Sequence, residues 1–287
     1  MTSESWTPLK VLTWTAGRFG ERGIDSARLD AELLLAHVLG TSRVALYTSF
    51  DKPLSVDELA RYRELVKRRL AGEPVAYLVG EQEFWSLALH VDEHVLIPRR
   101  DTETLVEVAL KAARSLPPGR IRLADVCTGS GAVAIALASE LPEAEVVATD
   151  ASDAALQVAS ANVARHGLAE RVQLRAGDLC APLDGHFAII AANPPYIPTG
   201  SLAGLAAEVR REPALALDGG ADGLTVLRRI IGDARTHLDP GGTLAVEHGF
   251  DQAAAVAALC AAAGYERVTT TRDLAGVERV TSGTTGR

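Results

Sequence analysis

The segment Asp125-Val126-Cys127-Thr128-Gly129-Ser130-Gly131 decides the fold, because it joins a short apolar run to an alanine-rich stretch. The run, Ile121–Val126, has the length of a strand, and the stretch, Ala132–Glu140, is predicted to be a helix. Glycines at such a junction let the backbone turn tightly and approach a ligand without a Cβ in the way. The segment therefore predicts the first strand-to-helix turn of an α/β sheet, although a tight turn without a ligand has the same pattern.

Short apolar runs alternate with helical segments in this half of the chain. Strands separated by helices indicate an α/β fold, a doubly wound, Rossmann-like and mostly parallel sheet with helices on both faces. Ile197–Gly223 has no clear period, and loops of such length are usually functional. The residues from Ser282 onward are expected to fray. The runs that we interpret as strands are Ile121–Val126, Val146–Thr149, Val172–Leu174, Phe187–Ala192, Leu244–Val246, Val268–Thr271 and Val277–Val280.

The residues before this sheet predict a small helical domain. Apolar residues recur there at helical spacing, with glycine-containing breaks between the helices. Ser55 and Glu58 form a capping-box pattern, which predicts that a helix begins there. The aromatic and apolar stretch Phe84–Val91 has no helical stripe and indicates a strand or hairpin. The predicted domains are a helical domain at 1–72, a linker with a β-hairpin at 73–100 and the α/β domain at 101–287.

The composition restricts the kinds of partner. Acidic residues outnumber basic residues by 37 to 29, and the net charge of -8 argues against nucleic acid as a direct partner. Cys127, Cys180 and Cys260 form no CxxC pair, so we expect a reducing compartment and no metal site. The N-terminus lacks the pattern of a secretion signal, and no apolar run reaches about 18 residues. These features predict a cytoplasmic protein that does not bind membranes.

Acidic residues follow the next two strands, where a nucleoside would bind. Asp150 comes about 20 residues after the glycine loop, where a carboxylate can accept from both ribose hydroxyls. At Asp178 and Leu179 an acid could accept from an adenine amino group while an apolar side chain lies on the ring. A dinucleotide fingerprint is the competing interpretation, but Ala134 replaces its third glycine, and each acid alone could cap a helix. Together these residues indicate an adenosyl cofactor at the carboxyl ends of three successive strands.

The segment Asn193-Pro194-Pro195-Tyr196 follows the predicted strand Phe187–Ala192 directly. Two prolines fix two φ angles and remove two N–H donors, which leaves the Asn193 side-chain oxygen and the Pro194 carbonyl as acceptors. Such acceptors suit a substrate –NH₂, and Tyr196 offers a flat face on which a planar group can stack. The alternative is a stiff Pro-Pro turn after a C-cap asparagine, with no function.

This loop resembles the (Asp/Asn/Ser)-Pro-Pro-(Tyr/Phe) motif of amino-methyltransferases, and the chain resembles the HemK/PrmC family of release-factor glutamine methyltransferases. The glycine loop alone identifies a superfamily, and adenine methyltransferases share the Pro-Pro loop, so the flanking blocks make the resemblance specific. One departure is Arg100, where we expect proline, and it changes the stiffness of that loop but no catalytic residue. The other matching segments are Arg28–His37, Pro74–Leu78, Glu83–Trp85, Ile97–Arg99, Asp101–Glu103, Glu212–Pro213, Glu247–Gly249 and Glu278–Val280.

The resemblance implies methyl transfer from S-adenosyl-L-methionine to the side-chain amide nitrogen of the glutamine in the Gly-Gly-Gln motif of bacterial-type class I peptide release factors. We also expect a monomer, and a helical domain that grips a second surface of the protein substrate. The implied catalytic residues are Asn193 and Pro194, and Asn193, Pro194, Pro195 and Tyr196 bind the substrate. The implied cofactor-binding residues are Cys127, Thr128, Gly129, Ser130, Gly131, Asp150, Asp178, Leu179 and Asn193.

Two other functions stay open from the sequence. A nucleic-acid adenine amino-methyltransferase would normally need a basic groove and a base-recognition insert, neither of which is evident. A non-catalytic module that binds an adenosyl ligand has no reason to keep two stiff prolines after Asn193. The roles of three residues are open as well: Arg99 and Glu103 either dock substrate or tie the linker to the α/β domain, and His248 is either catalytic or orders a loop.

Overall fold

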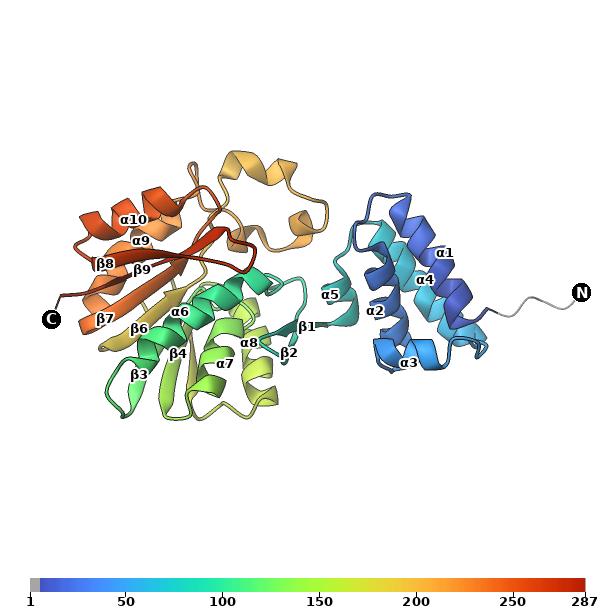
Figure 1. Ribbon diagram of the computed structural model, residues 1–287, viewed down its shortest axis with the longest axis horizontal. Coiled ribbons are helices and arrows are strands. Elements are labelled where there is room, and N and C mark those ends of the chain that lie inside the picture. Colours follow the sequence, from blue (N-terminus) through green and yellow to red (C-terminus); the bar gives the residue numbers. More distant parts are fainter. Residues whose placement is uncertain (1–5, 287) are drawn as a thin grey trace, which may run out of the picture. The chain divides into compact units, whose positions relative to one another are not determined.

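The computed structural model describes residues 6–286 and divides them into two compact units (Figure 1). The helical unit ends at Gly80 and also contains the segment Ala206–Arg211. The sheet unit runs from Glu81 to Leu205 and resumes at Glu212. Domain boundaries at residues 72 and 100 stay a prediction. Between residues 6 and 286, no helix combines the length and the apolar character that crossing a membrane requires.

The helical unit is built around one apolar core. Phe19, Leu34 and Tyr62 come from three different helices and are almost completely buried in it. The predicted capping box forms, because the Ser55 hydroxyl accepts from the Glu58 amide at 3.2 Å and the Glu58 carboxylate accepts from the Ser55 amide at 2.7 Å. The helices of this unit are α1 (Pro8–Gly20), α2 (Ala27–Leu39), α3 (Arg43–Thr48), α4 (Val56–Leu70) and α5 (Val75–Val79).

A buried arginine fastens the segment Ala206–Arg211 to the helical unit. Arg69 is 5% exposed, donates to Asp30 at 2.7 Å and pairs with Glu208 at 2.7 Å. Because a buried charge is costly unless it is paired, the two carboxylates hold this guanidinium in place. The segment belongs to the helical unit through this ion pair, although it lies far along the chain.

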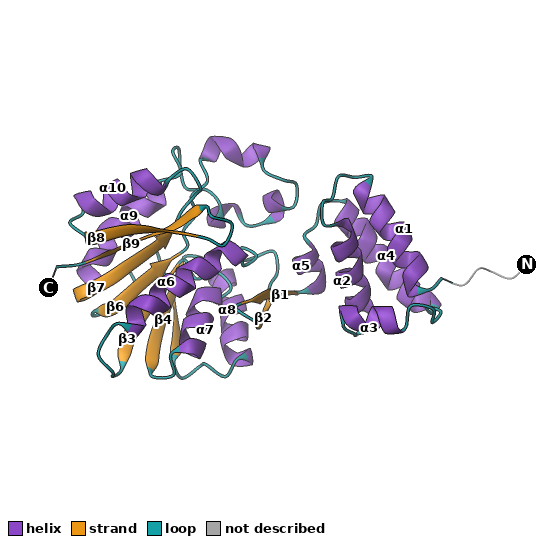
Figure 2. Ribbon diagram, viewed as in Figure 1, coloured by secondary structure: helices purple, strands orange, loops and turns teal. Residues whose placement is uncertain are grey.

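The main sheet of the sheet unit has seven strands in the order β5-β4-β3-β6-β7-β9-β8 (Figure 2). The strands from β5 to β7 are parallel, and β9 is antiparallel to both neighbours. The predicted Rossmann-like, mostly parallel sheet is therefore confirmed. Its strands are β3 (Ile121–Val126), β4 (Ala144–Asp150), β5 (Val172–Ala176), β6 (Phe187–Ala192), β7 (Leu238–Glu247), β8 (Glu266–Arg272) and β9 (Glu278–Thr284).

Each face of the sheet packs on its own apolar core, since successive side chains of a strand point to opposite faces. Leu123 and Ile189 lie in the core with α6 and α7, whereas Ala124 and Ile190 lie in the core with α9 and α10. The helices of this unit are α6 (Glu103–Arg114), α7 (Ala132–Glu140), α8 (Asp153–Arg165), α9 (Thr225–Ala234) and α10 (Ala253–Ala262).

The connecting segments bear out one expectation and overturn another. The hairpin expected within Phe84–Val91 is confirmed, as β1 (Glu81–Phe84) pairs antiparallel with β2 (Leu87–His90). The expectation that the chain frays from Ser282 is wrong, because β9 continues to Thr284, where backbone pairing with β7 holds it. The segment Ile197–Gly223 contains short 3-10 helices, η2 (Thr199–Gly204), η3 (Val209–Arg211) and η4 (Ala214–Ala216); the others are η1 (Arg100–Thr102) and η5 (Arg235–His237).

Candidate functional site

The central parallel strands end at one level, and the ladder register shows which residues follow. Val126 of β3 pairs with Thr149 of β4 on one side and with Ala192 of β6 on the other. Ala192 pairs in turn with Val246 of β7. In open α/β sheets, ligands bind outside this carboxyl edge. The residues that come next along these four strands are Cys127, Asp150, Asn193 and Glu247.

The glycine loop is held by a buried carboxyl from the strand before it. Asp125 Oδ2 accepts from the Thr128 hydroxyl at 2.6 Å and from the Ala134 amide at 3.1 Å. Burial raises the pKa of Asp125 to about 7, although the hydrogen bonds from these two donors lower it. Gly131 has a φ of 83°, and a Cβ there would lie 3.2 Å from Ile135 Cδ1, so the turn requires glycine. The sequence did not identify Asp125 as a site residue.

Asp150 lies where the sequence predicts a ribose acceptor. Its Oδ2 atom accepts from the Gly129 amide at 2.9 Å, and its Oδ1 atom accepts from the Ser152 amide at 2.9 Å. Each carboxylate oxygen accepts up to two hydrogen bonds, so both keep capacity for a ribose hydroxyl. The backbone thus fixes the orientation of this carboxylate at the edge of the sheet.

Asp178 has a partner that the sequence did not indicate. Arg229 of α9 forms an ion pair with the Asp178 carboxylate. The Leu179 backbone is held by the Thr149 hydroxyl, which donates to its carbonyl at 2.9 Å, and the Leu179 side chain is buried. Because Asp178 is already paired with a cation, its contact with an adenine amino group stays a prediction.

One cavity in the sheet unit brings most of the predicted residues together. Of the predicted set, Gly131, Pro194 and Tyr196 do not line it, whereas Asn193 and Pro195 do. Further walls come from the linker after β2 and from η4. The predicted residues that line the cavity are Cys127, Thr128, Gly129, Ser130, Asp150, Asp178, Leu179, Asn193 and Pro195.

The Asn-Pro-Pro-Tyr loop is fixed at both ends by side-chain hydrogen bonds. Asn193 Nδ2 donates to Thr102 Oγ1 at 3.1 Å, and the Tyr196 hydroxyl donates to Glu247 Oε1 at 3.2 Å. The Tyr196 carbonyl accepts from Gln252 Nε2 at 2.9 Å. Since Nδ2 already has an acceptor, the Asn193 side chain can offer its oxygen to a ligand, as the sequence predicts.

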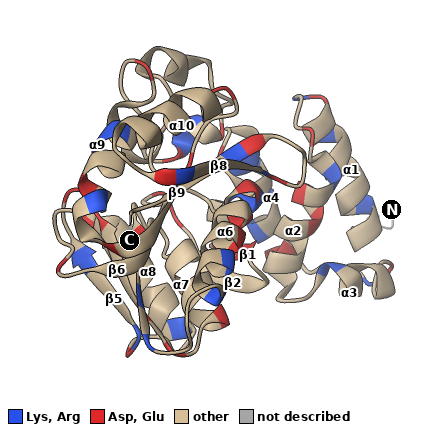
Figure 3. Cartoon of the chain, turned by 60° about the vertical axis from the view of Figure 1, so that its left-hand side comes forward, with Lys and Arg blue, Asp and Glu red and all other residues tan. Residues whose placement is uncertain are grey.

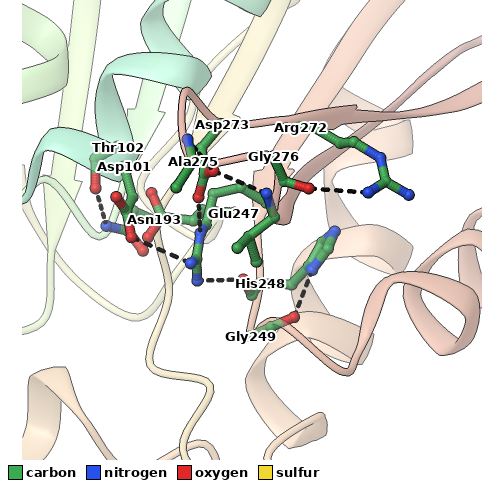
Figure 4. Close-up of polar contacts among 12 residues, drawn as sticks. Asp101, Thr102, Asn193, Glu247, His248, Gly249, Arg272, Asp273, Ala275 and Gly276 are labelled. Carbon is green, nitrogen blue, oxygen red and sulfur yellow. Dashed lines mark hydrogen bonds and ion pairs between the residues drawn. The ribbon is translucent and has the colours of Figure 1, made fainter.

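Glu247 is a buried acid at the end of β7 (Figure 4). Its Oε2 atom has no hydrogen-bond partner among residues 6–286. Burial raises the pKa of Glu247 to about 7, and the nearby charge of Asp101 acts in the same direction. The Thr102 hydroxyl, the Arg279 charge and the Tyr196 hydroxyl oppose this rise. The sequence placed Glu247 beside His248 at a strand end but gave it no role.

His248 orders the chain after β7. Its side chain is fully buried, with Nδ1 2.9 Å from the Gly249 carbonyl and Nε2 3.0 Å from the Thr281 hydroxyl. A carbonyl can only accept, so Nδ1 donates and Nε2 accepts from the hydroxyl. Burial lowers the pKa of His248, which favours this neutral form. With both ring nitrogens occupied, His248 has a structural role.

Arg99 and Glu103 tie neighbouring segments of the sheet unit together. Arg99 forms an ion pair with Glu212, whose other carboxylate oxygen accepts from the Ile97 amide at 3.0 Å. Glu103 accepts from the Trp85 amide at 3.1 Å, at the turn of the β1–β2 hairpin. Both side chains therefore connect the linker to the elements that follow it, which supports the structural interpretation.

Acidic and basic side chains are interspersed over the sheet unit (Figure 3). Arg175 pairs with Asp184 at 2.6 Å, and Arg122 approaches the same carboxylate at 3.4 Å. Arg228 likewise pairs with Asp222. Because these arginines face carboxylates of the same chain, they do not form the continuous basic groove that a phosphate backbone requires.

A Rossmann-like sheet with a glycine loop, an acid after the second strand of the motif and an Asn-Pro-Pro-Tyr loop at one carboxyl edge defines a methyltransferase. Residues 10–80 match the model of the PrmC N-terminal domain, and residues 102–208 match that of the methyltransferase small domain. The chain belongs to the family of release factor glutamine methyltransferases, as its relatives show.

These relatives match almost the whole chain. The release factor glutamine methyltransferase of Geobacter sulfurreducens is 47% identical over 285 residues, which cover 99% of this chain and 98% of that protein. The release factor glutamine methyltransferase of Moorella thermoacetica is 46% identical over 264 residues, 91% of this chain and 93% of that protein. A crystal structure of a methyltransferase from Pyrococcus furiosus covers 77% of this chain and 98% of its own, with a TM-score of 0.52 and 18% identity, and thus shares the fold.

The residues of the cavity fit an adenosyl cofactor such as S-adenosyl-L-methionine. A Cβ built on Gly129 would meet nothing within 4 Å, so the backbone is open to a ligand there. Asp150, Leu179 and Val226 line the cavity, where the carboxylate could accept from ribose hydroxyls and the two apolar side chains could contact a base. This combination of acceptors, open backbone and apolar walls is the chemistry that an adenosine needs.

We predict that Asp150→Ala weakens binding of S-adenosyl-L-methionine while the protein stays folded. Losing hydrogen bonds to a charged group costs about 1.5–3 kcal/mol, or roughly ten- to a hundred-fold in affinity. Calorimetric titration measures the change. Asp153→Ala is the matched control, because this exposed acid in the first turn of α8 does not line the cavity and should leave affinity unchanged. Wild-type affinity in folded Asp150→Ala would remove Asp150 from the site.

Proposed function

We propose that the chain transfers a methyl group from S-adenosyl-L-methionine to the side-chain amide nitrogen of the glutamine in the Gly-Gly-Gln motif of class I peptide release factors. The observation that carries this proposal is the full-length similarity to release factor glutamine methyltransferases, together with the acceptor-rich loop at the carboxyl edge of the sheet. We propose that Asn193, Pro194, Pro195 and Tyr196 hold the glutamine. The proposed cofactor-binding residues are Cys127, Thr128, Gly129, Ser130, Gly131, Asp150, Asp178, Leu179 and Asn193.

The proposed role of the loop follows from the chemistry of an amide. Its nitrogen is a poor nucleophile because the lone pair is delocalised into the carbonyl. When bound, S-adenosyl-L-methionine supplies an electrophilic methyl group. Asn193 Oδ1 and the Pro194 carbonyl would each accept a hydrogen bond from one N–H group of the glutamine amide. These two bonds would hold the amide nitrogen in line with that methyl group. Positioning of this kind contributes about 7–11 kcal/mol in well-oriented model reactions, and the proton can leave after transfer.

The helical unit gives this proposal a second contact surface. A groove between α1 and α4 is lined by apolar side chains that include Trp14, Leu59 and Val66, and the Trp14 side chain is 56% exposed. Exposed apolar surface of this kind marks interaction sites, including those for protein partners. We propose that this unit docks the release factor, so that the tripeptide is delivered to the cavity. The enzyme would act as a monomer in the cytoplasm, where its three unpaired cysteines stay reduced.

We predict that Asn193→Ala lowers the single-turnover rate of methyl transfer by at least about a hundredfold, because one positioned acceptor is lost. Affinity for S-adenosyl-L-methionine should fall much less. Ser201→Ala is a suitable control, since Ser201 is an exposed residue of η2 outside the cavity, and its rate should match the wild type. An unchanged single-turnover rate in Asn193→Ala would mean that this acceptor does not position the substrate.

We also predict that methyl label from S-adenosyl-L-methionine enters a folded class I release factor at the Gly-Gly-Gln glutamine. Replacing this glutamine should abolish the label, and an isolated short peptide should accept far less because it lacks the second docking surface. Mass spectrometry of the digested release factor locates the methyl group. Unmethylated DNA and RNA serve as control substrates and should stay at background. Label in nucleic acid with none in the release factor would refute the proposed substrate.

A further inference from the structure

Both ends of the Asn-Pro-Pro-Tyr loop converge on one buried carboxyl group. The register between β6 and β7 pairs Ala192 with Val246, which places the next residues, Asn193 and Glu247, at the same level of the sheet. The Tyr196 hydroxyl reaches Glu247 directly, at 3.2 Å from Oε1. The other end of the loop reaches a hydroxyl that lies beside the same carboxyl, as Figure 4 shows for Thr102, Asn193 and Glu247.

The protons available to these groups restrict how they are arranged. Thr102 is 4% exposed, and its hydroxyl oxygen accepts from Asn193 Nδ2. A hydroxyl carries one proton, which also needs an acceptor when it is buried. Glu247 Oε2 is buried, has no hydrogen-bond partner between residues 6 and 286, and belongs to the carboxyl group whose pKa the Thr102 hydroxyl lowers. Glu247 Oε2 is therefore a buried acceptor that is open to the Thr102 proton.

A hydroxyl whose proton is committed to a carboxylate can only accept from its other neighbours. An asparagine amide has two orientations, and a hydroxyl that only accepts selects the one that turns Nδ2 toward it. In that orientation Asn193 Oδ1 is left to meet a ligand in the cavity that Asn193 lines. The structure shows the donation from Asn193 Nδ2 to Thr102, and the Thr102 proton would continue the chain to Glu247.

We propose that Thr102 and Glu247 are positioning residues, which fix the orientation of the Asn193 amide and thereby set the acceptor that the substrate amide meets. This inference rests on the proposed transfer to a glutamine amide. Glu247 is 1% exposed and contacts the loop at Tyr196, so it acts through the loop and does not take a proton from the substrate. Its Oε1 atom holds the Tyr196 end of the loop, and its Oε2 atom would hold the Asn193 end through Thr102.

The groups around Glu247 set the pH range in which its carboxylate can accept the hydrogen bonds that hold the loop. Arg279 of β9 and the Thr102 and Tyr196 hydroxyls favour the carboxylate, whereas Asp101 of η1 disfavours it. A carboxylate accepts at both oxygens, whereas the protonated acid donates at one of them. Since burial raises the pKa of Glu247 to about 7, its supporting form is lost as the pH falls through that value.

The asparagine content of the chain allows a direct test of the amide orientation. Asn162 and Asn193 are its two asparagines, so ¹⁵N-asparagine labelling gives two side-chain NH₂ groups in an NMR spectrum. Thr102→Val removes the acceptor but keeps the shape, and it should shift the Asn193 NH₂ signals and speed their exchange with water. Thr102→Ser should restore them. The Asn162 signals are the internal reference, because Asn162 Nδ2 donates to the His90 and Ser130 carbonyls at 2.9 Å.

Kinetics of release-factor methylation then test whether the orientation matters. Thr102→Val should lower kcat about tenfold, as expected for one lost hydrogen bond, with KM for S-adenosyl-L-methionine changed less than about twofold. Thr102→Ser should recover most of the rate. In the Asn193→Ala background, Thr102→Val should cost less than about twofold, because residues that act through one another are not additive. Thr281→Val, which removes another buried hydroxyl, is the control and should keep kcat.

Glu247→Gln supplies a second variant, since an amide accepts at one end and donates at the other and cannot support both ends of the loop. At pH 8, kcat of Glu247→Gln should be lower than that of the wild type. The wild-type rate should fall below about pH 7, and this fall should be absent in the variant. Unmoved Asn193 signals in folded Thr102→Val, or additive losses in the double variant, would overturn the inference. A wild-type enzyme that methylates no release factor would refute the proposed function instead, and the NMR comparison would still decide the orientation.

Discussion

The common level at which β4, β3, β6 and β7 end is the constraint on which the site depends. Parallel pairing sets this level through backbone hydrogen bonds. The residues at the strand ends are therefore brought to one edge by the backbone, and their placement does not depend on contacts between their side chains. Each of these residues then contributes something different. Cys127 begins the glycine loop, Asp150 offers carboxylate oxygens, Asn193 begins the stiff loop and Glu247 supports that loop.

Two loops at this edge are supported in the same way, by a buried acid at the end of a neighbouring or preceding strand. Asp125 holds the glycine loop through Thr128 and Ala134, and Glu247 holds the Asn-Pro-Pro-Tyr loop. Burial raises the pKa of each acid to about 7, which reflects the cost of placing a carboxylate away from water. Hydrogen bonds from the loops offset part of this cost, and they tie the loops to the rigid sheet.

Much of the fold follows from local patterns in the sequence. The bounds of β3, β6 and α7 match the apolar runs and the alanine-rich stretch, because buried parallel strands and their helices are marked by composition alone. The long β7 and the antiparallel β9 were underestimated, since residues such as Thr284 are kept in the sheet by pairing with distant backbone and not by their own propensity. The short helices α3 and α5 had no period long enough to recognise.

The candidate site was predicted less completely than the fold. Asn193 follows β6 directly and Asp150 is the last residue of β4, so their positions along the chain are informative. Thr102 lies some 90 positions before Asn193 in the chain. Arg229 pairs with Asp178 because the fold brings α9 near that residue. No spacing rule links such pairs, although the alignment of strand ends would have placed Glu247 beside Asn193.

The proposed function depends on Asn193 Oδ1 and the Pro194 carbonyl, which would accept hydrogen bonds from the two N–H groups of a glutamine amide. The most direct measurement is a crystal structure of the enzyme bound to S-adenosyl-L-homocysteine and a class I release factor. Both oxygens should lie within about 3 Å of the glutamine amide nitrogen, and Asn193 Nδ2 should still donate to Thr102. A glutamine whose amide nitrogen faces neither oxygen, or an Asn193 side chain turned so that Nδ2 points at the substrate, would contradict it.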